Sequence, residues 1–266
     1  MDKLRLTILG CGSSGGVPRL GNNWGRCDPN NPKNRRLRCS LLVERIGAGG
    51  TTRVLIDTSP DMRAQLLAAD VGTLDAVIFT HEHADHVHGL DDLRMIVINM
   101  RKRIPIYAAR YTREAIVTRF NYAFETPEGS DYPPILEMNS LPSDLRINGA
   151  GGSIDIHSFD VKHGRIHVRA IKINNCLYTP DISAVLPKNE GEFEALDLWI
   201  VDALRDTPHP SHFSLEEAIA HINRFAPKHA ILTNMHIDLD YQTVMDQTAD
   251  NIEVAYDMMQ IELDID

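Results

Sequence analysis

The pattern of apolar and polar positions in the first half of the chain predicts short strands, tight turns and two helices. Five apolar runs have the length and the Leu, Ile and Val content of strands. They lie at 4–9, 39–45, 53–57, 75–80 and 104–109. The glycine-rich segment 47–50 predicts a hairpin turn between two of these strands. Apolar side chains at helical spacing predict a helix over 60–70, and a second helix is predicted over 86–98.

The second half of the chain repeats this alternation of strands and helices. Strand-like runs occur at 153–161, 167–173, 176–179, 197–203 and 229–235. A helix is predicted over 214–225, and residues 110–145 predict a helix followed by a loop. Neither an internal repeat nor a linker-like stretch divides the sequence. We therefore expect an α/β fold in which two layers of sheet are covered by helices, within one domain spanning 1–266.

Composition and charge narrow the classes of function. The formal net charge of the 266 residues is −10, which argues against a protein that mainly grips a nucleic-acid backbone, because such binding depends on Lys and Arg. No segment approaches the roughly 20 apolar residues of a membrane span, and the N-terminal apolar run is too short for a secretory signal. We expect a cytoplasmic protein with free thiols. The cysteines are Cys11, Cys27, Cys39 and Cys176.

The most informative segment is HEHADH, which follows a predicted buried strand and leads into a predicted helix. Alternate residues of an extended segment point to the same side, so His81 and His83 can bind one metal ion. Asp85 and His86 fall at the start of the helix and can serve a second ion. Mixed imidazole and carboxylate ligands suit zinc, manganese or iron. The sequence therefore predicts a metal site at this strand end.

A catalytic metal also needs ligands from distant parts of the chain, which leave an open position for water. His163, Asp181 and His236 each lie just past a predicted strand, where several loops can converge. Any one of these residues, taken alone, is a weak candidate, because a lone histidine in a loop is more often solvated than bound to a metal. Their value as candidates depends on the order in which they follow the HEHADH segment.

This order, H-x-H-x-D-H and then His, Asp and His after later strands, resembles the ligand series of the metallo-β-lactamase superfamily. The resemblance covers nearly the whole chain and implies an αββα sandwich of two mixed sheets, with two divalent ions, zinc or manganese, at one edge. It implies one ion on His81, His83 and His163, a second on Asp85, His86 and His236, and Asp181 as the bridge.

The flanking segments resemble the phosphodiesterase branch typified by the PhnP proteins, which act on phosphoribosyl cyclic phosphates and are related to ribonuclease Z. The residues that carry this similarity are GCGSSGGVP at 10–18, CDP at 27–29, NRR at 34–36 and GLDDLR at 89–94. The implied activity is hydrolysis of a small phosphodiester, a cyclic ribose or nucleotide phosphate. The implied partners are such a substrate, with no membrane and no nucleic acid expected; a homodimer is left open.

Three features of the same region have competing interpretations. Residues 10–15 spell G-x-G-x-x-G, but Val17 and Pro18 follow instead of the helix that a dinucleotide site requires. Arg35 and Arg36 are candidates for binding an anionic substrate, although a solvated, structurally paired loop explains them better. The PhnP proteins carry a closely spaced cysteine cluster for an additional zinc, and this chain lacks it.

His212 is predicted to be a general acid. Ser214 and Glu217 form a capping box that fixes the start of the following helix and therefore the loop that carries His212. The matching histidine of similar phosphodiesterases transfers protons, so the resemblance implies that His212 protonates the leaving oxygen. Asp85 is expected both to bind one ion and to orient the attacking water.

Other activities of the same fold compete with this hypothesis. A tRNA 3′-processing endonuclease would need an arm that reaches tRNA, and no such insertion is present. A thioester hydrolase is disfavoured by the phosphodiesterase-like flanks, and an oxygen-reducing di-iron protein would have a carboxylate at His83. The alternative outside the enzymes is a non-catalytic member of the same fold that binds a nucleotide or a metal. Tight nucleotide binding without turnover would distinguish it.

Overall fold

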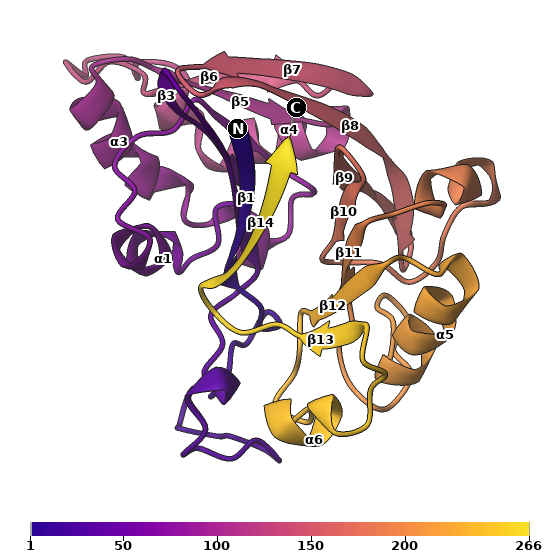
Figure 1. Cartoon of the computed structure of the whole chain (residues 1–266). Helices are drawn as coiled ribbons and strands as arrows, with labels where there is room; N and C mark the ends of the chain where they lie inside the picture. The colour runs from indigo at the N-terminus through magenta and orange to yellow at the C-terminus, as the bar shows by residue number, and fades with distance from the viewer. Residues whose placement is uncertain (1, 266) are drawn as a thin grey trace. The chain divides into compact units, whose positions relative to one another are not determined.

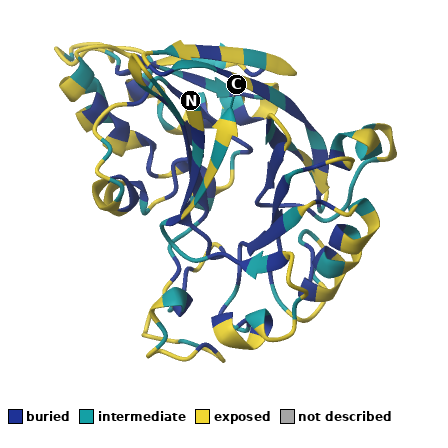
Figure 2. Cartoon of the chain, in the orientation of Figure 1, coloured by how far each residue is buried: buried dark blue, intermediate teal, exposed yellow. Residues whose placement is uncertain are grey.

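The computed structural model describes residues 2–265 and divides into two compact units (Figure 1). Unit 1 comprises the N-terminal segment up to Leu9, Ser40–Asp155 and the C-terminal segment from Gln260. Unit 2 comprises Gly10–Cys39 and Ile156–Met259. Buried residues follow the strands of each unit, whereas exposed residues gather on helices and loops (Figure 2). The expectation of a single domain over 1–266 stays a prediction.

A seven-stranded mixed sheet forms unit 1, in the order β14-β1-β2-β3-β4-β5-β6. Gly47 pairs with Gly50 in the β2–β3 hairpin, as the glycine-rich turn predicts. β3 to β6 run parallel, and every residue of β4 is buried, which is typical of interior strands in a parallel sheet. The strands are β1 (Asp2–Gly10), β2 (Ser40–Gly47), β3 (Gly50–Ile56), β4 (Ala76–Ile78), β5 (Ile104–Ala108), β6 (Leu136–Ser140) and β14 (Met259–Ile265).

The helix predicted over 86–98 is broken into three short pieces, so this prediction is wrong in its continuity. Gly89 separates the first piece from the others because its amide donates to the carbonyl of Thr58 at 2.9 Å. A Cβ at position 89 would lie 2.0 Å from the carbonyl oxygen of Ser59. The helices of unit 1 are α1 (Met62–Ala68), α2 (Ala84–Val87), α3 (Leu93–Met100) and α4 (Arg110–Arg119), with 3-10 turns η2 (Leu90–Asp92) and η3 (Asn121–Ala123).

A second seven-stranded sheet has the order β13-β12-β11-β10-β9-β8-β7, and all of it except β7 and the start of β8 belongs to unit 2. β8 and β9 form an antiparallel hairpin, whereas β10 to β13 run parallel. The strands are β7 (Asp144–Gly149), β8 (Gly152–His163), β9 (Ile166–Ile173), β10 (Cys176–Thr179), β11 (Leu198–Asp202), β12 (His229–Thr233) and β13 (Ile252–Val254). The remaining elements are α5 (Leu215–Phe225), α6 (Tyr241–Met245), η1 (Pro32–Asn34) and η4 (Pro187–Phe193).

These elements confirm the predicted fold class, α/β with two mixed sheets and flanking helices. The helix predicted after residue 110 is α4, but the loop predicted to follow it also contains β6 and the start of β7. No pattern in the sequence predicted β13, β14 or α6. Within residues 2–265, no helix has the length and hydropathy needed to cross a bilayer.

Candidate metal centre

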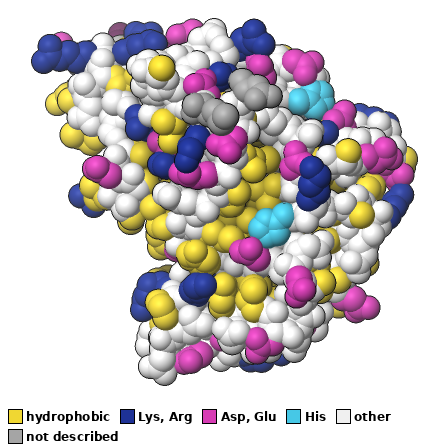
Figure 3. All heavy atoms as spheres, in the orientation of Figure 1, with side chains coloured by type: hydrophobic (Ala, Val, Ile, Leu, Met, Phe, Trp, Pro, Cys, Tyr) yellow, Lys and Arg dark blue, Asp and Glu magenta, His cyan; other side chains and the backbone are white. Residues whose placement is uncertain are grey.

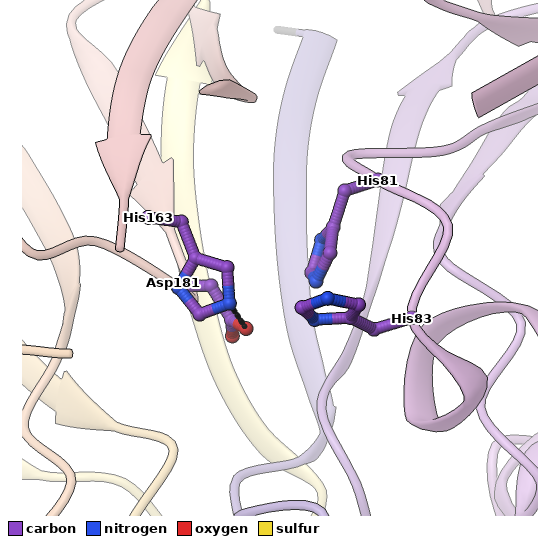
Figure 4. Close-up of side chains that lie close together, drawn as sticks. All are labelled: His81, His83, His163 and Asp181. Carbon is purple, nitrogen blue, oxygen red and sulfur yellow. Dashed lines mark ion pairs between the residues drawn. The ribbon is translucent and has the colours of Figure 1, made fainter. Parts of the chain in front are cut away.

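The HEHADH segment begins in the loop after β4 and continues into α2, as predicted. His83 is the N-cap of α2, and Asp85 and His86 lie in its first turn. The ring of His81 lies 4.5 Å from that of His83 and 4.2 Å from that of His86, measured between centroids. His81 and His86 are buried and His83 is exposed (Figure 4 draws His81 and His83). The three imidazoles of unit 1 therefore form one compact cluster.

The buried carboxylate of Asp57, at the end of β3, orients two of these imidazoles. Nδ1 of His86 donates to Oδ2 of Asp57 at 2.8 Å. Nδ1 of His81 lies 2.9 Å from Oγ of Thr80, which donates in turn to Oδ2 of Asp57 at 2.8 Å. Each ring thus has its proton on Nδ1 and its lone pair on Nε2, the atom that binds metals in proteins when a carboxylate holds the other nitrogen.

Parallel strands bring the later candidates of unit 2 to one sheet edge. Thr179 of β10 pairs with Val201 of β11, and Asp202 of β11 pairs with Thr233 of β12. The chain beyond these strand ends therefore places Asp181 after β10 and His236 after β12 on the same side of the sheet. The carboxyl ends of parallel strands are the usual position for ligand sites in open α/β sheets.

Nε2 of His163, the last residue of β8, lies 3.5 Å from Oδ2 of Asp181 (Figure 4). Both side chains are at most 4% exposed. Nδ1 of His163 donates to the carbonyl of Ser211 at 2.6 Å, so the Nε2 that faces the carboxylate carries the lone pair. Nδ1 of His236 lies 2.8 Å from Oδ2 of Asp238.

The donor chemistry fits divalent metal ions. Three of the predicted histidine ligands have Nδ1 held by a carboxylate, a hydroxyl or a carbonyl, and in each the ring offers Nε2. This is the arrangement that metal-binding histidines adopt in proteins. Imidazole and carboxylate donors suit zinc and manganese alike. The three histidines are His81, His86 and His163.

A second network in unit 2 surrounds His212. Nδ1 of His212 lies 2.7 Å from Oδ2 of Asp202, and its ring centroid is 4.6 Å from that of His163. Complete burial raises the pKa of Asp202 to about 7, an effect that His212 opposes. Nδ2 of Asn234 donates to Oδ1 of Asp202 at 3.1 Å and to Oδ1 of Asp181 at 3.3 Å. The predicted capping box of Ser214 and Glu217 is present.

Arg36 is buried, whereas a residue that binds substrate must be accessible. Its side chain is 1% exposed, and Nη1 donates to the carbonyl of Leu239 at 2.8 Å and to that of His236 at 3.4 Å. The interpretation of Arg36 as a substrate contact is therefore corrected, because its donors are committed to the loop that carries His236. Arg35 is exposed, and its guanidinium lies 5.1 Å from the ring centroid of Trp24.

All four cysteines are free and buried. Burial raises the pKa of Cys11 and Cys39 well above the usual value and that of Cys176 to about 12. These thiols therefore stay protonated at neutral pH, and protonated thiols are poor metal ligands.

The sequence analysis missed Asp57, Asp202, Asn234 and Arg19. Asp57 and Asp202 each stand at the carboxyl end of a buried strand, in L-I-D and I-V-D, so a search for acidic residues at strand ends would have found them. Asn234 has a backbone φ of 61°, and no sequence pattern identifies such a position. The contacts of Arg19 depend on tertiary structure alone.

Comparison with known proteins identifies relatives over the whole chain. The model of the beta-lactamase superfamily domain matches residues 52–237. An octanoyltransferase of Porphyromonas gingivalis is 31% identical over 98% of this chain and 52% of its own length. The chain therefore spans about half the length of that relative.

Two solved structures are also similar. A diphosphatase from the PhnP family has 30% identity and a TM-score of 0.85, with 99% of this chain and 98% of that chain covered. The short form of human tRNase Z has 18% identity and a TM-score of 0.66, with both chains fully covered, and this likeness concerns the fold alone.

Proposed function

Because the chain belongs to the beta-lactamase superfamily, and within it to the PhnP family, we propose that it is a metal-dependent phosphodiesterase that hydrolyses a small cyclic ribose or nucleotide phosphate. The observation that carries this proposal is the contact between His212 and His163. A proton-transfer group oriented by a buried carboxylate lies 4.6 Å, between ring centroids, from a predicted metal ligand. Hydrolysis of a phosphodiester needs this pairing of a metal and an acid.

The proposed ligand set is the one that the family resemblance assigns. His81, His83 and His163 would hold one divalent ion, Asp85, His86 and His236 would hold a second, and Asp181 would bridge them. Zinc or manganese fits these donors. Bound divalent ions of this kind acidify water and stabilise negative charge on phosphoryl oxygens.

The chain's own residues carry the proton transfers of the proposed reaction. Asp85 would orient the attacking water, which releases one proton to the solvent; its oxygen forms a bond to phosphorus as the bond to the leaving oxygen breaks. His212 gives that leaving oxygen a proton from Nε2, because Nδ1 on the opposite side of the ring is held by Asp202. Asp202 fixes the orientation of the ring and stabilises its positive charge, as the buried carboxylate does in other His–Asp pairs.

A diphosphate is the second candidate substrate. The PhnP-family relative with 30% identity is a diphosphatase, and a P–O–P bond presents the same phosphoryl oxygens to the site. The octanoyltransferase relative adds an octanoyl thioester as a weaker candidate. Nucleic acid is disfavoured by the net charge of −10, and acidic and basic side chains are interspersed on the face drawn in Figure 3.

The test is hydrolysis by protein reconstituted with manganese or zinc. The substrates are 5-phosphoribosyl 1,2-cyclic phosphate, a 2′,3′-cyclic nucleotide, a nucleoside diphosphate derivative, octanoyl thioester and precursor tRNA. We expect opening of the cyclic phosphates that is abolished in His86→Ala. Cleavage of precursor tRNA or thioester with inert cyclic phosphates would refute the proposed substrate class.

The role of His212 is tested by the leaving group. A leaving alkoxide needs a proton, whereas nitrophenolate departs without one, so His212→Ala should lower kcat about 100-fold or more for alkyl esters and much less for nitrophenyl esters. His167→Ala, which changes an exposed histidine on β9, is the control. Equal losses on both kinds of ester would contradict the assignment.

A further inference from the structure

Arg19 lies at the end of the glycine-rich loop of unit 2, in a backbone held from both sides. Val17 exchanges two hydrogen bonds of 2.9 Å with the backbone of Arg36. Arg19 exchanges two with Asn23, of 2.9 and 3.2 Å, and so closes a tight turn. Gly21 at the tip of this turn has a φ of 82°, which favours glycine. The Cα of Arg19 is therefore fixed in position.

The side chain of Arg19 is directed at His236. A Cβ at Gly15 would lie 3.1 Å from Nε and 3.3 Å from Cγ of Arg19, so the glycine leaves room for the arginine stem. Nη2 of Arg19 contacts Nε2 of His236, the nitrogen that is turned away from Asp238. The guanidinium thus lies at the ring atom through which His236 would bind a metal ion.

The charge of Arg19 is not balanced by an acidic neighbour. Over residues 2–265, no carboxylate lies within salt-bridge distance of its guanidinium, whereas Arg26 in the same loop is paired with Asp206. A guanidinium aimed at a metal ligand is stable next to a cation only when an anion lies between them, because like charges repel.

We propose that Arg19 binds the phosphate of the substrate, using its planar fork on two non-bridging oxygens while the same phosphate approaches the ion on His236. This proposal rests on the proposed phosphodiesterase function and takes the place of the role first considered for Arg36. A guanidinium fork matches the geometry of phosphate oxygens, and a neutral acyl group offers it no such pair. Arg19 therefore selects phosphate esters over thioesters.

The experiment compares Arg19→Gln and Arg19→Lys with the control Arg26→Gln in metal-loaded protein. Calorimetry measures the Kd of inorganic phosphate, kinetics give KM and kcat for the cyclic phosphate, and elemental analysis gives metal content. Loss of a charge-assisted bond should raise the phosphate Kd and KM of Arg19→Gln about 10- to 100-fold. Arg19→Lys should recover part of this loss, and Arg26→Gln should match the wild type.

The outcomes separate this proposal from the proposed function. Unchanged phosphate Kd and KM in Arg19→Gln would overturn the role of Arg19 while leaving phosphodiesterase activity in place. An Arg19→Gln protein that loses a metal ion would also overturn it, since Arg19 would then act through His236. Arg19-dependent phosphate binding in a wild-type protein that hydrolyses no phosphate ester would support Arg19 and refute the proposed activity.

Discussion

Replacement of Asp57 by Asn should invert the tautomer of His86. Oδ1 of Asp57 accepts from the amide of Thr80 at 2.8 Å, and an asparagine carbonyl can still do so. The amide nitrogen of the asparagine then occupies the position of Oδ2. In the wild type, Oδ2 accepts a hydrogen bond from Nδ1 of His86. To avoid two facing donors, His86 moves its proton from Nδ1 to Nε2, which removes the lone pair that a metal needs. Asp57 has a φ of 64°, which Asn tolerates as well as Asp does, so the backbone is not perturbed.

The expected magnitudes follow from the bonds that change. Two hydrogen bonds to a buried carboxylate become bonds to a neutral amide, so metal-free protein should lose about 1–3 kcal/mol of unfolding free energy. Loss of the partner that orients a metal-binding histidine lowers metal affinity about 10- to 100-fold. Because Thr80 links the same carboxylate oxygen to His81, the effect should reach the ion held by His81 as well as the ion held by His86.

The assay is competition for zinc against a chromophoric chelator, with ¹⁵N shifts of the histidine rings as a direct measure of the tautomer. Thr80→Ser retains the hydroxyl that links His81 to Asp57 and serves as the control. Wild-type affinity for both ions in Asp57→Asn, with the proton of His86 still on Nδ1, would refute this reasoning.

Two further predictions concern stability. Gly89→Ala should lower the free energy of unfolding by about 2–3 kcal/mol, because the new Cβ would lie 2.0 Å from the carbonyl oxygen of Ser59. Denaturant titration measures this loss. The control is Gly191→Ala, because no atom lies within 4 Å of a Cβ at that position. Burial raises the pKa of Asp257 from 3.8 to about 7, so the folded protein binds a proton that the unfolded chain releases between these values. The unfolding free energy of metal-free protein should therefore fall by up to about 4 kcal/mol as the pH rises through this range. Asp257→Asn should flatten that fall, and an unchanged slope would contradict the assignment.

The sequence predicted the positions of the metal-ligand candidates well because they are local features of strand ends. HEHADH follows a buried apolar run, and its place after β4 and at the start of α2 depends only on nearby residues. Their predicted metal-binding roles stay predictions. The sequence could not predict the break in the helix expected over 86–98. This break depends on the close approach of Gly89 to Ser59, which lies about 30 residues earlier in the chain.

The residues that orient the ligands could not be predicted, because their partners are distant in sequence. Asp57 and His86 are 29 residues apart, and His163 and Ser211 are 48 apart. Arg36 is buried against carbonyls near residue 239, which are distant in the sequence. In the sequence alone, its basic side chain suggested a surface role, and the structure does not support that role.

The division of the chain has a consequence for its synthesis on the ribosome. Unit 2 needs Gly10–Cys39 together with Ile156–Met259, and the roughly 115 residues of Ser40–Asp155 are made between them. At about 5–20 residues per second, the first segment waits roughly 6–23 s for its partner strands. Cys11, Cys27 and Cys39 lie in that segment. These thiols are buried in the folded protein but accessible to oxidants and alkylating agents in the nascent chain. A ribosome-stalled chain that ends before residue 156 should therefore react at all three cysteines.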